Sequence, residues 1–239
     1  MKKNRIIWIT GASSGIGRAL VHEYVSHGDL VVASARREDE LRKLKRDLRG
    51  EKGRCFIEPC DVRSERAVSS VANRIFSRHS RLDVLINSAG VTYFREFSAT
   101  SLKEFDHVVD TNLRGLFLAT RAVLPAMLSR ESGLIVNILS YAARATYAKS
   151  AAYSASKSGA EALMNVLREE TRGKGIKVVN VFPGAIKTPM WPPDVQAKYG
   201  NQMVSAAEVA RVVFEATLSP LSLMIEELVV RPQVGDLKV

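Results

Sequence analysis

The chain is poor in the residues that build disulfide and metal sites. Only Cys55 and Cys60 among its 239 residues are cysteines, they do not form a CxxC motif, and the four histidines are scattered. We therefore expect neither a disulfide framework nor a metal site. No apolar run approaches the roughly 18 residues of a membrane span, which argues against membrane insertion. These absences favour a cytoplasmic location.

An excess of positive charge, +10 at pH 7, raises nucleic acid as a partner. The densest basic stretch, residues 36–54, holds nine Lys and Arg against five Asp and Glu and contains no aromatic residue. Because no stacking platform accompanies the charge, the stretch fits a solvated helix face better than a nucleic-acid site. We expect no nucleic-acid partner.

Short runs rich in Val, Ile and Leu alternate with helical stretches along the chain. The strand candidates are residues 5–10, 30–35, 54–58, 83–87, 133–139, 177–182 and 225–230. Most do not alternate between apolar and polar residues, as expected for strands buried on both faces. The series predicts one α/β domain over residues 1–239. Its fold would be a doubly wound (Rossmann) seven-stranded parallel sheet with helices on both faces.

Two predictions concern the second half of the chain. Ser101 is expected to cap a long helix that reaches Arg130, with Pro125 bending or breaking its last turns. Residues 188–204, which are rich in proline, are expected to be an irregular lid over the substrate. Met190 and Trp191 of this lid are candidate substrate contacts.

A glycine-rich segment follows the first predicted strand and opens the first predicted helix. Glycines there allow a tight turn and let the backbone approach a pyrophosphate, while the helix start offers free N–H groups. The candidate phosphate-binding residues are Gly11, Ser13, Ser14, Gly15, Ile16 and Gly17. The alternative is an ordinary turn between a strand and a helix.

The second predicted strand ends at Ala35, where NAD-binding folds carry an acidic residue for the ribose hydroxyls. Arg36 and Arg37 follow, and arginine matches the geometry of a 2′-phosphate. The pattern favours NADP(H) as the cofactor. The alternative is that both arginines simply begin a solvated helix.

Four further residues suggest proton transfer at a carbonyl group. Tyr153 and Lys157 are four residues apart in a predicted helix and share a face, so that the ammonium group can lower the pKa of the phenol. Ser140, at the end of a predicted strand, can donate to a carbonyl oxygen. Asn112 lies within a helix, where Asn is unfavourable, and we interpret it as a polar kink that orders water beside Lys157.

Taken together, these segments resemble the short-chain dehydrogenase/reductase family over essentially the full length. The family motif Thr-Gly-x-x-x-Gly-x-Gly is intact from Thr10 to Gly17. The motif Asn-Asn-Ala-Gly appears with one departure, as Asn87-Ser88-Ala89-Gly90. The family's catalytic tetrad is matched in order and spacing by Asn112, Ser140, Tyr153 and Lys157.

The resemblance implies a role for each residue. Tyr153 would transfer the proton, Lys157 would lower the pKa of Tyr153 and hold the ribose, Ser140 would polarise the carbonyl, and Asn112 would anchor a water relay. Further cofactor contacts are implied at Asp61 and Val62 for adenine, at Pro183, Gly184, Ile186 and Thr188 for the carboxamide, and at Asn87, Ala89 and Gly90.

We therefore expect an NADPH-dependent carbonyl reductase or alcohol dehydrogenase that acts on a small ketone or secondary alcohol. A weaker resemblance to sepiapterin-reductase-like members lies in residues 188–191 and 225–232. The alternatives are a 3-oxoacyl thioester reductase and a catalytically idle NADPH-binding regulator. Family resemblance also suggests a homodimer or homotetramer.

Overall fold

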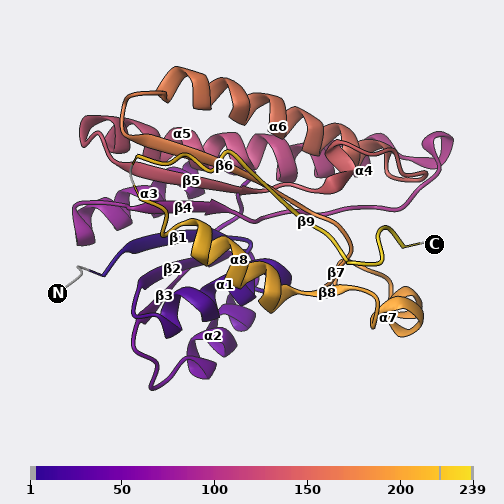
Figure 1. The fold of residues 1–239 in the computed structure, drawn as a ribbon, viewed down its shortest axis with the longest axis horizontal. Helices are drawn as coiled ribbons and strands as arrows, with labels where there is room; N and C mark the ends of the chain where they lie inside the picture. The colour runs from indigo at the N-terminus through magenta and orange to yellow at the C-terminus, as the bar shows by residue number, and fades with distance from the viewer. Residues whose placement is uncertain (1–3, 221, 238–239) are drawn as a thin grey trace.

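A parallel seven-stranded sheet runs through the centre of the protein, with helices on both faces (Figure 1). The computed structural model describes residues 4–220 and 222–237. The strand order is β3-β2-β1-β4-β5-β6-β9. The predicted doubly wound seven-stranded fold is confirmed, although residues 1–3, 221 and 238–239 of the predicted domain lie outside the described part of the chain.

The bounds of the seven central strands agree closely with those expected from the sequence. The central strands are β1 Ile6–Thr10, β2 Leu30–Ala35, β3 Arg54–Pro59, β4 Val84–Asn87, β5 Gly133–Ile138, β6 Ile176–Pro183 and β9 Glu227–Val230. The helices are α1 Gly15–Ser26, α2 Glu38–Asp47, α3 Glu65–His79, α4 Leu102–Val109, α5 Gly115–Ser129, α6 Ala151–Thr171, α7 Pro193–Tyr199 and α8 Ala206–Ala216. A separate pair of short strands consists of β7 Ile186–Lys187 and β8 Val204–Ser205.

Neighbouring side chains along a strand enter two different cores, one on each face of the sheet. In β1, Ile7 and Ile9 join the core formed with α1, α2 and α8, whereas Trp8 joins the core formed with α3, α5 and α6. Both faces of the strand are therefore buried, which explains its continuous apolar sequence. Across the described residues, no helix is long and apolar enough to span a bilayer.

The strand order reverses between β1 and β4, which is where ligands bind in sheets of this kind. The carboxyl ends of these two strands are tied together. Thr10 Oγ1 accepts hydrogen bonds from the backbone N–H groups of Ser88, at 3.2 Å, and Ala89, at 3.3 Å. The glycine-rich loop after β1 and the Asn87–Gly90 motif after β4 are thus held side by side.

The prediction of one continuous helix from Ser101 to Arg130 is wrong. A π-helical segment, Asp110–Arg114, separates α4 from α5. Such a segment widens the helix and occurs frequently at functional sites. The expected break near Pro125 is also absent, because α5 continues through this residue to Ser129.

The prediction that the lid of residues 188–204 is irregular is wrong in part. It contains α7 and leads into β8, which pairs with β7. Pro193 is the first residue of α7, a position where the missing N–H of proline costs nothing. In Figure 1 this helix lies at the same end of the molecule as the C-terminal segment.

Candidate active site

The glycine-rich loop leaves no room for side chains at two positions. Gly11 has a φ of +69°, and a Cβ atom there would lie 2.7 Å from the backbone of Ala89. A Cβ atom at Gly17 would lie 2.4 Å from the carbonyl oxygen of Gly11. The loop therefore exposes backbone, as the close approach of a phosphate group requires.

The start of α1 supplies donors for an anion. Its N-cap, Ser14, makes no side-chain capping bond within the described chain, so the first N–H groups of the helix stay available. Arg37 Nη2 donates to the hydroxyls of both Ser13 and Ser14, at 3.0 Å each. An arginine at a backbone cradle fits a nucleotide phosphate.

The two arginines after β2 face different groups. Arg37 contacts the glycine-rich loop, whereas Arg36 lies near Asp61 and helps to lower the pKa of that carboxyl group. The main cause of the lowered pKa is Arg63, which donates to Asp61 at 2.6 Å. Arg63 was not predicted from the sequence, although an arginine two residues after Asp61 is a plausible ion-pair partner for it.

The predicted adenine and carboxamide segments flank the loop. Val62 packs against the start of α5, where a Cβ atom at Gly115 would lie 2.7 Å from its side chain. At the other side, the Thr188 side chain lies 3.2 Å from where a Cβ atom of Gly15 would be. Ile186, in β7, pairs with Val204 of β8, and the Gly184 N–H donates to Val230 at 2.8 Å.

Tyr153 and Lys157 lie on successive turns of α6, as the sequence predicts. Lys157 Nζ lies 5.7 Å from the centre of the Tyr153 ring and donates to the carbonyl oxygen of Ile138 at 2.8 Å. Only 4% of Lys157 is exposed, and this burial lowers the pKa of its ammonium group to about 8.

Ser140 lies two residues beyond the end of β5, rather than on the strand itself. It caps the short helix Tyr141–Ala143, where its Oγ accepts a hydrogen bond from Ala142 at 3.1 Å. Its side chain also lies close enough to Tyr153 to influence the pKa of the phenol. Burial raises the pKa of Tyr153, and the Ser140 side chain acts in the opposite direction. Burial therefore outweighs the expected lowering of the Tyr153 pKa.

The π-helical segment places Asn112 inside the protein. The Asn112 side chain accepts from the Val91 N–H at 2.8 Å and donates to the Val91 carbonyl at 2.9 Å. It also donates to Ser156 Oγ at 3.0 Å, and Ser156 in turn donates to the carbonyl of Tyr153 at 2.7 Å. Asn112 thus joins the loop after β4 to α6. Ser156 is a second residue that sequence reasoning missed.

Gly90 lies between the Asn112 and Lys157 side chains. A Cβ atom at Gly90 would be 3.5 Å from Asn112 Oδ1 and 3.6 Å from Lys157 Nζ. Asn112, Ser140, Tyr153 and Lys157 (the tetrad) are therefore joined by hydrogen bonds and close approaches, although the first and last lie 45 positions apart in the sequence.

The side chain of Asn87 faces the interior of the sheet. Asn87, Asn137 and Asn180 are in register on β4, β5 and β6, and their amides are hydrogen bonded at 3.0 Å. Asn180 continues the row to Asn165 of α6, and Asn87 donates to Thr120 of α5. We call these five residues the asparagine ladder. Any contact of Asn87 with a cofactor stays a prediction.

The lid contacts the loop that follows β4. Trp191 stacks on Phe94 with ring centres 5.5 Å apart and planes 16° from parallel. The indole N–H of Trp191 donates to the carbonyl of Ile186 at 3.0 Å. Met190, the other predicted substrate contact, is 40% exposed. Phe94 was missed because its partner is distant in sequence.

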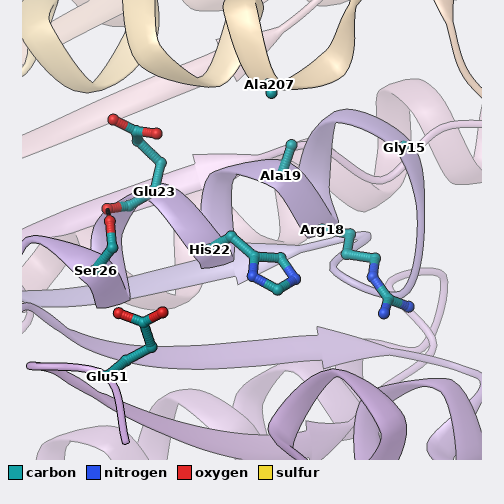
Figure 2. A pocket seen from close by; sticks show the side chains of 8 residues that line it. All are labelled: Gly15, Arg18, Ala19, His22, Glu23, Ser26, Glu51 and Ala207. Carbon is teal, nitrogen blue, oxygen red and sulfur yellow. Dashed lines mark hydrogen bonds between the residues drawn. The ribbon is translucent and has the colours of Figure 1, made fainter. Parts of the chain in front are cut away.

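Two open grooves lie away from the tetrad. One, of about 400 Å³, runs along α1 towards α8 and is lined by Arg18, His22 and Glu51 among others (Figure 2). The other, of about 610 Å³, is lined by residues of α4 together with Arg63 and Tyr93. Neither groove has a tetrad residue in its lining.

Comparison with known proteins identifies the family. The family model for short chain dehydrogenases matches residues 5–198. A sepiapterin reductase from Chlorobaculum tepidum is 32% identical over 240 residues, which cover 98% of each chain. A metagenomic short-chain oxidoreductase solved in complex with NADP is 32% identical, with a TM-score of 0.84 and coverage of 96% of this chain and 97% of that one.

A third similar structure is an actinorhodin polyketide ketoreductase variant with NADPH, at 30% identity, a TM-score of 0.89 and 98% coverage of each chain. The predicted cofactor, NADP(H), is thus the one held in both of these structures. The fold, the motifs and the family match agree, and the chain belongs to the short-chain dehydrogenase family of oxidoreductases.

Proposed function

We propose that the protein is an NADPH-dependent carbonyl reductase that can also run in reverse as an alcohol dehydrogenase. The observation that carries the proposal is the position of Lys157, whose buried ammonium group lies 5.7 Å from the centre of the Tyr153 ring, with the Ser140 side chain also near Tyr153. Two hydroxyls on neighbouring elements can bind one carbonyl oxygen. A buried cation nearby favours negative charge at that position.

Each tetrad residue has a distinct task in this reaction. The Ser140 hydroxyl donates to the substrate oxygen as negative charge grows there, and the Tyr153 hydroxyl transfers its proton to the same oxygen. Lys157 stabilises the tyrosinate that results, and Asn112 holds the loop that contains Gly90 against α6. A bound nicotinamide would supply the hydride, so that with the proton from Tyr153 the carbonyl group would gain two electrons and two protons in total and become an alcohol.

The residues at the cradle fit NADP(H). Arg37 reaches the hydroxyls of Ser13 and Ser14, and Arg36 lies near Asp61, so both guanidinium groups border the adenosine end of the site. No carboxylate takes the place of Ala35. This arrangement supports recognition of a 2′-phosphate, which pairs well with arginine.

The aromatic pair Phe94–Trp191 supports a substrate with a flat or apolar group next to its ketone. Both rings belong to loops at the carboxyl end of the sheet, and Met190 adds an exposed apolar side chain. The similarity to a sepiapterin reductase is consistent with this substrate class. The similarity to a polyketide ketoreductase keeps a 3-oxoacyl thioester as the second candidate.

The proposed assembly is a homodimer or homotetramer. Leu102 and Phe105 of α4 and Phe117 of α5 are large apolar side chains that stay exposed in the single chain, Leu102 to 81%. Such side chains are frequently covered by a partner. The cytoplasmic location stays a prediction.

The test is consumption of NADPH and of NADH with a panel of aryl ketones, diketones, pterins and 3-oxoacyl thioesters. We expect turnover with NADPH and one of the ketone classes. The variant with Arg36→Ala and Arg37→Ala should lose roughly 10- to 150-fold in kcat/KM for NADPH, since a hydrogen bond to a charged group contributes about 1.5–3 kcal/mol. The values for NADH should hardly change.

A matched control carries Arg42→Ala and Lys43→Ala. This control also removes two positive charges, but from exposed ion pairs on α2. This control should keep its preference for NADPH. Absence of turnover with every carbonyl in the panel, despite tight binding of NADPH, would favour the idle regulator instead.

A further inference from the structure

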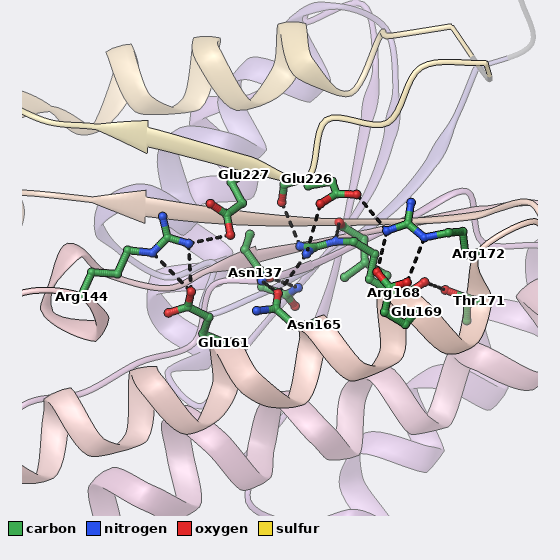
Figure 3. Close-up of polar contacts among 12 residues, drawn as sticks. Asn137, Arg144, Glu161, Asn165, Arg168, Glu169, Thr171, Arg172, Glu226 and Glu227 are labelled. Carbon is green, nitrogen blue, oxygen red and sulfur yellow. Dashed lines mark hydrogen bonds and ion pairs between the residues drawn. The ribbon is translucent and has the colours of Figure 1, made fainter.

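The turn after Ser140 is tied to strand β9 by Arg144. This arginine lies just beyond the short helix Tyr141–Ala143 and donates to Glu161 of α6 at 2.9 Å. It also pairs with Glu227, the first residue of β9, at 2.5 Å (Figure 3). Its guanidinium lies 3.7 Å from the centre of the Phe182 ring. The end of the turn is therefore fixed to both α6 and β9.

Arg231, directly after β9, holds the beginning of the same turn. Its guanidinium lies 4.0 Å from the centre of the Tyr141 ring, and Tyr141 follows Ser140 in the chain. Arg231 also pairs with Asp236 at 2.9 Å. Asp236 also interacts with the Tyr147 hydroxyl. Desolvation is the main cause that raises the pKa of this phenol to about 12, and the Asp236 carboxylate adds to it. The segment after β9 thus packs against both Tyr141 and Tyr147.

These contacts matter because Ser140 has little support of its own. Strand β5 ends at Ile138, and the helix that Ser140 caps contains three residues. A 3₁₀ turn of this length has few backbone hydrogen bonds to fix it. The described contacts of the Ser140 side chain are those with Ala142 and Tyr153. The backbone N–H groups of Ala143, which donates to Ser140, and of Arg144 and Ala145, which donate to Tyr141, set the shape of the turn. Its neighbours then help to orient it.

We propose that Arg144 and Arg231 are positioning residues, which clamp the Ser140 turn against β9 and so aim the serine hydroxyl at the reacting carbonyl. The idea rests on the proposed carbonyl reduction. Arg231 is well placed for a second reason, because a Cβ atom at Gly184 would lie 3.1 Å from its Cγ atom. The predicted carboxamide segment and the Ser140 turn therefore share one support.

The test compares Arg144→Ala and Arg231→Ala with a matched control, Arg172→Ala. Arg172 is also a paired guanidinium, but it contacts Glu169 and Glu226, away from the turn (Figure 3). Because a misplacement of about 1 Å can cost about 10²-fold in rate, we expect kcat to fall by about 10- to 100-fold in each clamp variant. The KM for NADPH and its binding should stay within about twofold of wild type.

Two readouts separate positioning from a general structural role. The apparent pKa of the Tyr153 limb in the pH profile should rise in the clamp variants, since the Ser140 contact that lowers it is loosened. Amide hydrogen exchange over residues 140–147 should become faster, while exchange in α1 and α3 is unchanged. The Arg172→Ala control should change neither readout.

The proposal is overturned if the clamp variants keep the wild-type pH profile and the wild-type exchange over residues 140–147. If Arg231→Ala does not fold, Arg231→Lys replaces it as the test variant. It keeps the ion pair with Asp236 but loses the planar stack on Tyr141, so exchange should still increase. If the wild-type enzyme reduces no carbonyl, the proposed function fails, and the exchange measurement still decides whether the clamp exists.

Discussion

The asparagine ladder and the tetrad are both polar networks beside the sheet, and they differ in whether their side chains can ionise. In the ladder, neutral amides on adjacent strands bond one another, and Asn137 and Asn180 are fully buried. In the tetrad, burial lowers the pKa of Lys157 and raises that of Tyr153. The ladder contains no ionisable group, whereas the tetrad contains two groups whose pKa values are shifted from their ordinary values.

The comparison teaches where to look for chemistry among buried polar residues. A network of neutral amides and a hydroxyl stabilises one arrangement of strands and has no readily ionised proton to transfer. A network whose ionisable members have pKa values shifted by burial is a candidate site for proton transfer. We therefore expect changes in the ladder to affect stability, and changes in the tetrad to affect rate.

The largest effect is expected for Tyr153→Phe. This change removes the proposed proton donor and keeps the ring, so kcat should fall by about 10²- to 10⁴-fold, the usual contribution of general acid–base catalysis. NADPH binding, measured by fluorescence, and the melting temperature should stay near wild type. Tyr93→Phe, which alters a tyrosine bonded to His107, is the control and should remain active. Turnover within threefold of wild type in Tyr153→Phe would contradict the assignment.

Ser140→Ala should have the next largest effect. A donor that acts on developing negative charge contributes about 2.7–4 kcal/mol, so kcat should fall by about 10²- to 10³-fold, with little change in KM. Ser77→Ala removes an exposed hydroxyl of α3 that donates to the Arg74 carbonyl, away from the tetrad, and is the control. A change in KM alone would make Ser140 a binding residue rather than a catalytic one.

Because the Lys157 ammonium group is buried, we expect the stability of the protein to depend on pH. Its pKa is about 8 in the folded protein and 10.5 in the unfolded chain, so between these values only the unfolded chain binds the proton. The free energy of unfolding should therefore rise from pH 8 to pH 10.5, by about 3 kcal/mol for this group. Urea unfolding without cofactor, compared between wild type and Lys157→Met, isolates the effect.

Lys174→Met, at an exposed position, provides the control for that comparison. Its difference from wild type should not vary with pH. If the difference between wild type and Lys157→Met is also constant from pH 8 to pH 10.5, Lys157 is not desolvated as described.

The smallest effect is expected in the ladder, from Thr120→Val. This nearly isosteric change removes the hydroxyl that accepts from Asn87 Nδ2 at 3.1 Å, and Thr120 is 4% exposed. A buried donor left without its partner costs about 1–3 kcal/mol of unfolding free energy. The value of kcat per folded molecule should not change. A fall in kcat without loss of stability would show that the two networks are coupled.

The parts of the site that depend on backbone could be predicted from the sequence. Gly11 and Gly17 occupy positions where any side chain would collide, and such positions leave a visible glycine pattern. Tyr153 and Lys157 were predicted as a pair because helix periodicity alone brings them to one face. The strands were found because burial on both faces makes their sequences continuously apolar.

The parts that depend on distant partners could not be predicted. The π-helical segment accompanies the bonds of Asn112 to Val91 and Ser156, which are 21 and 44 residues away. Helix α7 was not predicted because proline disfavours the interior of a helix but is favourable at its first position, where Pro193 lies. The division of roles between Arg36 and Arg37 depends on side-chain directions that sequence spacing does not specify.

The π-helical segment makes the enzyme sensitive to chain length as well as to residue type. Its turn contains an additional residue compared with an α-helical turn, and this residue lets Asn112 leave the regular helical path. Loss of any one residue from Asp110–Arg114 would allow α4 and α5 to merge into one α-helix. Everything before the deletion would then rotate by about 100° around the helix axis relative to α5. Single-residue deletions should thus be tolerated far less in these five positions than in the exposed turn around Gly173.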